Sequence, residues 1–160
     1  MKNIKRVAIC VGTRPEAIKM GPVYLELTKD DRFEPILFST GQHKEMLQQV
    51  FNVFDIKPDI DLEVMSPNQT LASLTSKLIK EISLSFGNLD LDAVLVHGDT
   101  TTCFSAGISA FYQKIKIGHV EAGLRTYDFQ APWPEEMNRR LIDPISNWCF
   151  APTERAAQNL

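Results

Sequence analysis

The chain has 160 residues, a length that suits one domain of ordinary size with a single compact core. Its 17 basic and 20 acidic residues give a net charge of −3, which argues against nucleic acid binding by charge and favours a small-molecule partner. The apolar stretch 7–11 near the N-terminus is too short for a signal-peptide core or a membrane span, so we expect a cytoplasmic protein without a membrane partner.

Apolar runs that look like buried strands alternate with helix-like stretches along the chain. Such alternation predicts an α/β fold in which helices cover both faces of a parallel sheet, giving three layers. A short additional strand is expected within 60–64. The principal strands are expected at 6–11, 35–39, 93–97, 115–120 and 148–151.

The helices between these strands are predicted from the spacing of apolar residues. The first begins near Pro15, and Gly21-Pro22 is expected to kink it or split it in two. The second is expected at 43–54 with one buried face, and Thr70 is expected to cap the third. A fourth is expected at 101–112 and a fifth from Glu135. The buried face of the second helix is expected to contain Met46, Leu47, Val50, Phe51 and Phe54.

The end of the sequence resembles the start of a further helix, because Thr153 is a suitable capping residue for an apolar face that follows it. The sequence stops one or two turns later. We therefore expect residues 1–160 to be one domain of a longer chain; a short helix that frays at a native terminus is the alternative.

The turn after the first strand carries a glycine followed by two cations at a helix start. Unpaired N–H groups and the positive end of the helix dipole favour an anion there, and Arg14 or Lys19 could contact phosphate. The motif is neither the dinucleotide-binding fingerprint nor the Walker loop, so nicotinamide and ATP chemistry are not indicated. An ordinary turn with Arg14 in a structural ion pair is the alternative.

Two acidic residues, Asp99 and Glu121, follow later strands and should meet Arg14 at one edge of the sheet, where open α/β sheets bind ligands. Asp99 could instead be a helix N-cap. Glu121 could instead form a structural ion pair with Arg125.

The segment 126–134 has three aromatic residues and two prolines, and it precedes the helix that begins at Glu135. We interpret it as a loop that folds over a ligand and sets Glu135 beside Asp99 and Glu121. Carboxylates that share a dry cleft separate their pKa values, so that one can donate a proton while another accepts one. Stabilisation by the helix dipole is the alternative explanation for Glu135 and Glu136.

The pairs His97-x-Asp99 and His119-x-Glu121 could also form a metal site, which would suit a metal-dependent hydrolase. Both histidines lie inside apolar strands, where a hydrogen-bonded core histidine is more frequent, so we predict no metal.

Five segments resemble the non-hydrolysing UDP-N-acetylglucosamine 2-epimerases in the family's order: GTRPEAIKM (12–20), TGQH (40–43), VHGDT (96–100), GHVEAGLR (118–125) and PWPEEMNR (132–139). The resemblance implies a glycosyltransferase-B type fold, in which two Rossmann-like domains enclose the active site. Residues 1–160 would be the N-terminal domain, and a catalytic histidine would come from the other domain.

The resemblance implies interconversion of UDP-GlcNAc and UDP-ManNAc for surface polysaccharide synthesis, by elimination and re-addition of UDP and without a cofactor. It implies acid/base roles for Asp99, Glu121 and Glu135. The full-length protein is expected to be a homodimer. A related UDP-2-acetamido sugar as substrate, and the hydrolysing branch of the family, are alternatives. The implied substrate contacts are Arg14, Lys19, Arg125 and Asn138, and the implied allosteric contacts are Gln42, His43 and Gln69.

Overall fold

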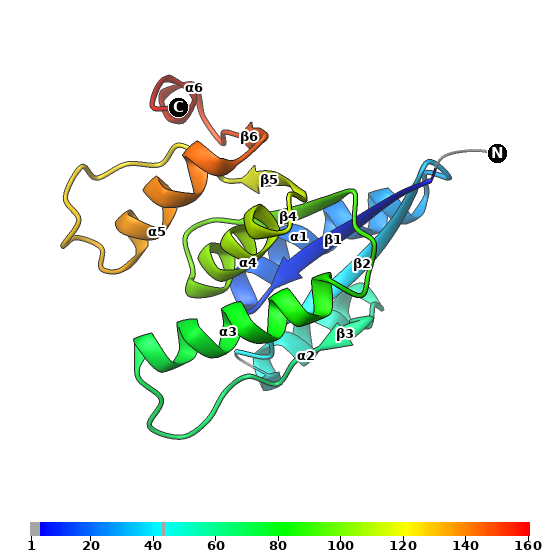
Figure 1. The fold of residues 1–160 in the computed structure, drawn as a ribbon. Coiled ribbons are helices and arrows are strands. Elements are labelled where there is room, and N and C mark those ends of the chain that lie inside the picture. Colours follow the sequence, from blue (N-terminus) through cyan, green and yellow to red (C-terminus); the bar gives the residue numbers. More distant parts are fainter. Residues whose placement is uncertain (1–3, 43) are drawn as a thin grey trace.

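A computed structural model describes residues 4–42 and 44–160. Its sheet has six strands in the order β3-β2-β1-β4-β5-β6, and every pairing in it is parallel (Figure 1). The predicted parallel α/β sheet is therefore confirmed. The strands are β1 (Lys5–Val11), β2 (Phe33–Ser39), β3 (Ile60–Asp61), β4 (Ala93–His97), β5 (Lys116–Val120) and β6 (Trp148–Phe150).

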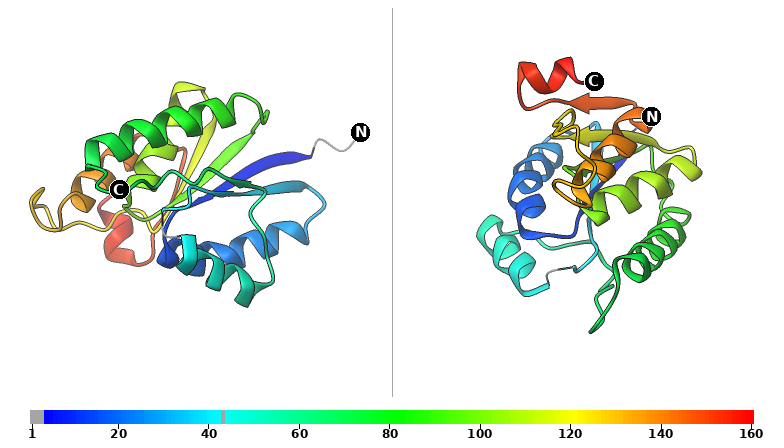
Figure 2. Two further views of the ribbon diagram at one scale, coloured as in Figure 1. Left: turned by 90° about the horizontal axis from the view of Figure 1, so that it is seen from below. Right: turned by 90° about the vertical axis from the view of Figure 1, so that its left-hand side faces the viewer.

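Helices lie on both faces of the sheet, as the alternating pattern predicts (Figure 2). None of the helices within the described residues has the length and hydropathy that crossing a bilayer requires. They are α1 (Arg14–Thr28), α2 (Lys44–Phe54), α3 (Leu71–Phe86), α4 (Thr101–Tyr112), α5 (Glu135–Ile142), the 3-10 turn η1 (Asp143–Ile145) and α6 (Glu154–Gln158).

The central strand β1 is apolar from Val7 to Val11, where it is buried on both faces. Ala8 and Cys10 pack in a core with α3 and α4, whereas Ile9 and Val11 pack in a second core with α1 and α2. Alternate residues of a strand point to opposite faces, so a single run of apolar residues supplies both cores.

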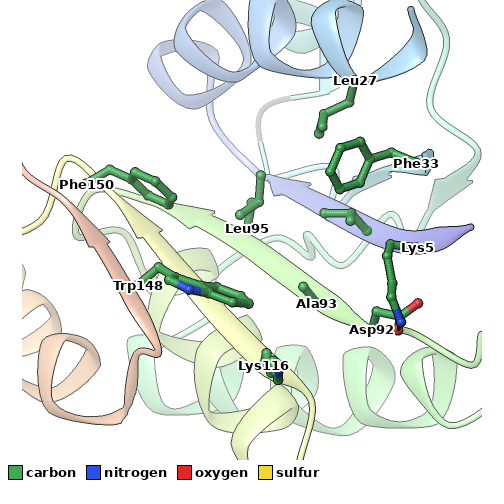
Figure 3. Close-up of a pocket in the computed structure, with 10 residues that line it drawn as sticks. Lys5, Leu27, Phe33, Asp92, Ala93, Leu95, Lys116, Trp148 and Phe150 are labelled. Carbon is green, nitrogen blue, oxygen red and sulfur yellow. Dashed lines mark hydrogen bonds and ion pairs between the residues drawn. The ribbon is translucent and has the colours of Figure 1, made fainter. Parts of the chain in front are cut away.

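An apolar hollow of about 500 Å³ lies on the face of the sheet, beside α1 (Figure 3). Leu95 lies on its floor, and Trp148 and Phe150 line it from β6. Several of the lining residues are the first residues of their strands, so the hollow extends to the amino ends of the strands. The acidic residues singled out in the sequence follow the opposite ends.

Two details of the helices differ from those expected. Of the two outcomes expected at Gly21-Pro22, the split is wrong: α1 continues from Arg14 to Thr28 with Pro22 inside it. Gly21 serves packing, because a Cβ built there would lie 2.8 Å from the Phe54 ring of α2. The predicted buried face of α2 is wrong at Met46, which is 46% exposed; Leu47, Val50 and Phe51 are buried and Phe54 is partly buried against the same core.

A buried polar network joins the ends of β4 and β5 to η1. His119 is bonded through Nδ1 to Asp143 Oδ1 (2.6 Å) and through Nε2 to the Gly98 carbonyl (2.7 Å). Arg125 donates to the other oxygen of Asp143 (2.5 Å). The alternative of a Glu121–Arg125 ion pair is therefore wrong, and His119 is a hydrogen-bonded core histidine.

Burial alone would raise the pKa of Asp143, but the hydrogen bonds from His119 and Arg125 outweigh the effect of burial and lower the pKa.

The Asp143→Asn variant is expected to lower the free energy of unfolding at pH 7 by about 3 kcal/mol, because it leaves the buried Arg125 without its counter-ion. Since the folded-state pKa is lowered, the stabilisation by Asp143 is present above the usual aspartate pKa of about 4 and disappears as the pH falls through the folded-state value. Urea unfolding at several pH values measures this. The difference in the free energy of unfolding between wild type and Asp143→Asn should become smaller as the pH falls. A difference independent of pH would contradict this, and exposed Asp55→Asn is the control.

Gly12 is required where β1 and α4 approach each other closely. A Cβ at this position would lie 2.1 Å from Thr102 Oγ1 and 2.4 Å from Thr40 Oγ1. Gly12→Ala is expected to destabilise the fold by about 1–3 kcal/mol through overpacking. In the control Gly87→Ala the nearest atom is 3.5 Å away and φ is −61°, so thermal unfolding should show no loss. Equal effects of both changes would contradict the steric explanation.

Candidate active site

Three of the charged residues singled out in the sequence, Arg14, Asp99 and Glu121, follow the carboxyl ends of parallel strands. Arg14 is the first residue of α1, directly after β1; Asp99 follows β4, and Glu121 follows β5. The carboxyl ends of parallel strands share one edge, so the fold brings these residues to one side of the sheet.

The turn between β1 and α1 is occupied by a side chain of its own. Glu16 accepts hydrogen bonds from the backbone N–H groups of Gly12 (2.8 Å) and Thr13 (2.7 Å). The expectation that the N–H groups of this turn are unpaired is therefore wrong for these two. Arg14 is exposed, and its guanidinium forms no hydrogen bond or ion pair with residues 4–42 and 44–160, so it can reach an anion.

Glu121 lies at the centre of a small charged cluster. Its carboxylate forms an ion pair with Lys19 of α1 and lies 3.5 Å from Nε2 of the buried His97. Burial lowers the pKa of His97, and the charge of Glu121 opposes that change only in part. Glu121 also has a φ of 65°, a left-handed conformation that is uncommon outside glycine and is concentrated at functional sites. The structure thus joins Lys19 and Glu121, two of the predicted site residues.

Asp99 is anchored to α5 by two contacts. Its carboxylate lies 3.1 Å from Arg139, and its backbone carbonyl accepts a bond from Asn138 (2.8 Å). Burial raises the pKa of Asp99; Arg139 opposes this, and the nearby charges of Glu135 and Glu121 add to it. Asp99 is not the N-cap of α4, because Thr100 is that cap and accepts a bond from Cys103 N (3.0 Å).

The start of α5 contains two acidic residues with different surroundings. Glu135 is half-buried and near enough to Asp99 for its charge to raise the pKa of that carboxyl. Glu136 is fully buried and accepts bonds from the backbone N–H groups of Thr126 and Tyr127, both at 3.0 Å. These bonds lower the pKa of Glu136 even though burial acts to raise it. Glu136 therefore holds the base of the 126–134 loop, whereas Glu135 lies near Asp99.

The remaining predicted substrate and allosteric contacts are not bonded to Asp99 or Glu121 among the described residues. Arg125 is held by Asp143 rather than by Glu121. Gln42 accepts a bond from Thr102 (3.2 Å) near the β1 turn, whereas Gln69 accepts one from Ser66 N (3.2 Å) within its own loop. Among the described residues, Gln69 forms no hydrogen bond or ion pair with Asp99 or Glu121. His43 lies outside the described residues.

The metal-site alternative gains no support from the geometry. Both ring nitrogens of His119 are already hydrogen-bonded, to Asp143 and to the Gly98 carbonyl. Across the part of the chain that the structure describes, no three His, Cys, Asp or Glu side chains are grouped as metal ligands.

The sequence did not predict a part in the site for two residues at this edge, Glu16 and Asp143. The spacing Thr13-x-x-Glu16 matches the capping-box pattern, a signal that could have identified Glu16 as the partner of its own turn. No local pattern identifies Asp143, because its partner His119 is 24 residues away in the sequence.

Comparison with known proteins connects this arrangement to one family. The family profile described as UDP-N-acetylglucosamine 2-epimerase matches residues 25–160. The UDP-N-acetylglucosamine 2-epimerase of Neisseria meningitidis serogroup A is 53% identical over 155 residues, which cover 97% of this chain and 42% of that relative.

Solved structures show the same similarity. The UDP-GlcNAc 2-epimerase from Neisseria meningitidis, bound to UDP-GlcNAc, has a TM-score of 0.93 and 52% identity over 96% of this chain and 42% of that chain. The enzyme from Methanocaldococcus jannaschii, in complex with UDP-GlcNAc and UDP, has a TM-score of 0.90 and 36% identity over 96% of this chain and 42% of that chain.

These neighbours confirm the Rossmann-like fold of the glycosyltransferase-B type. The chain spans 42% of the length of the Neisseria relative. The match of the family profile over residues 25–160 shows that the chain belongs to the UDP-N-acetylglucosamine 2-epimerase family.

Proposed function

We propose that the complete protein interconverts UDP-GlcNAc and UDP-ManNAc, and that residues 1–160 form its N-terminal domain. The observation that carries the proposal is the cluster of Asp99, Glu121 and Glu135 at the edge of the sheet that also presents Arg14 and Lys19. Related enzymes that are 52% and 36% identical are solved with UDP-GlcNAc bound.

The chemistry requires an acid and a base, because the hydrogen on carbon 2 of the sugar has no neighbouring carbonyl to make it acidic. A base removes that proton while the bond from carbon 1 to the UDP oxygen breaks, which gives UDP and 2-acetamidoglucal. UDP then adds back to carbon 1 while an acid protonates carbon 2 from the opposite face. No nicotinamide takes part in this sequence.

The environments of the carboxylates suit a division of these roles. Burial raises the pKa of Asp99, a change in the direction that suits a proton donor. Glu121 and Glu135 are then the candidate proton acceptors. Arg14 and Lys19 are suited to hold the diphosphate as it leaves, since cations stabilise charge that develops on a leaving phosphate. Asn138 and Arg125 support the site through Asp99 and Asp143.

Two alternative reactions would give products that differ from UDP-ManNAc. A related UDP-2-acetamido sugar would pass through the same elimination, whereas the hydrolysing branch would release free ManNAc. We propose a homodimer as the state of the complete protein, located in the cytoplasm.

The complete protein incubated with UDP-GlcNAc in heavy water is expected to incorporate deuterium at carbon 2, as detected by NMR of the recovered nucleotide sugar. Asp99→Asn, Glu121→Gln and Glu135→Gln are each expected to lower kcat by about 10²–10⁴-fold, the contribution of a positioned acid or base. Exposed Glu45→Gln on α2 is the control. Recovered UDP-GlcNAc without deuterium would contradict the elimination mechanism.

The isolated chain of 160 residues is expected to turn over no UDP-GlcNAc. Closure of a cleft between two domains excludes water and completes the set of catalytic groups, and one wall cannot do this alone. NMR of a long incubation with UDP-GlcNAc checks this. Formation of UDP-ManNAc by the isolated chain would show that one domain suffices.

A further inference from the structure

Glu16 is a buried acidic residue that neither the acid/base set nor the substrate contacts include. Its side chain is 1% exposed, and four hydrogen-bond donors surround its carboxylate. Buried carboxylates are costly unless they are fully hydrogen-bonded, and burial raises the pKa of Glu16 despite these donors. A group retained at such a cost requires an explanation beyond local helix capping.

The two oxygens of Glu16 bind different parts of the fold. Oε2 accepts bonds from Gly12 N (2.8 Å), Thr13 N (2.7 Å) and Thr13 Oγ1 (2.9 Å), all in its own turn. Oε1 accepts a bond of 2.5 Å from Thr100 Oγ1, which is 84 residues away in the sequence. A capping box needs only the first group of bonds. The bond to Thr100 therefore connects the turn after β1 to the turn after β4.

Both of these turns carry residues of the proposed site. Arg14 lies between Thr13, which donates to Glu16, and Glu16 itself. Lys19 follows three residues after Glu16 on the same helix. Asp99 immediately precedes Thr100, whose hydroxyl also caps α4 by accepting a bond from Cys103 N (3.0 Å). A single buried carboxylate thus sets the distance between the cations suited to the diphosphate and the acid suited to the sugar.

We propose that Glu16 is a positioning residue, whose carboxylate holds the turn that carries Arg14 and Lys19 in register with the turn that carries Asp99 and Thr100. This inference rests on the proposed function, because it assigns those turns to leaving group and sugar. It predicts an effect on the chemical step, since a displacement of about 1 Å between reacting groups costs about 10²-fold in rate.

The test measures kcat and KM of the complete protein for three variants. Glu16→Ala is expected to lower kcat by about 10²-fold and to change KM less than threefold. Glu16→Gln keeps the length of the side chain, one acceptor oxygen and a donor for Thr100 Oγ1, so it should recover about tenfold of that loss. Exposed Glu26→Gln on the same helix α1 is the matched control and should leave both constants unchanged. A kcat of Glu16→Ala within threefold of wild type would overturn the proposal.

Amide hydrogen exchange separates positioning from simple capping and does not depend on activity. If Glu16 links the two turns, Glu16→Ala should speed exchange at Gly12 and Thr13 and also at Cys103, whose N–H bonds to Thr100. Faster exchange confined to Gly12 and Thr13 would overturn the link. A wild-type protein without turnover would overturn the proposed function alone, and the exchange at Cys103 would still decide the role of Glu16.

Discussion

The parallel pairing of β1, β4 and β5 is the constraint on which the rest of this structure depends. It brings to one edge the turns that begin at Gly12, Gly98 and Glu121, although these lie far apart along the chain. Strands buried on both faces are mostly apolar, so most of the polar and charged groups of the site come from the residues that follow them, with His97 and His119 as buried exceptions near the strand ends. The apolar hollow beside α1 illustrates the contrast, because its lining offers few polar groups.

Buried charge at this edge is stabilised by hydrogen bonds rather than by exposure to water. Glu16, Glu136 and Asp143 are all buried, and each accepts bonds from two or more donors that belong to a turn or loop of the site. Asp99 and Glu121 differ from them, because each is partly exposed and has a single cation beside its carboxylate. The buried carboxylates hold backbone turns or neighbouring side chains in place, and the partly exposed ones remain available for a substrate.

The sequence predicts the architecture well, because long apolar runs and helical spacing carry strong signals; β4 and α4 have the predicted bounds. It misses features set by contacts between distant residues. Helix α1 continues across Pro22, where Gly21 packs closely against Phe54 of α2, and Arg125 binds Asp143 rather than Glu121. The acid/base roles of the site residues follow from the resemblance of the motifs to a known family. The residue pattern alone is equally compatible with structural roles for Asp99 and Glu121.

The central claim is that the strand-end carboxylates act on the sugar while Arg14 and Lys19 hold the diphosphate. A crystal structure of the complete protein with UDP-GlcNAc tests it most directly. The account predicts that an oxygen of Asp99, Glu121 or Glu135 lies within about 3.5 Å of carbon 2 or of the atoms bonded to it, and that Arg14 or Lys19 contacts the diphosphate. A nucleotide sugar bound in the apolar hollow beside α1, or one whose carbon 2 faces none of these carboxylates, would contradict the account.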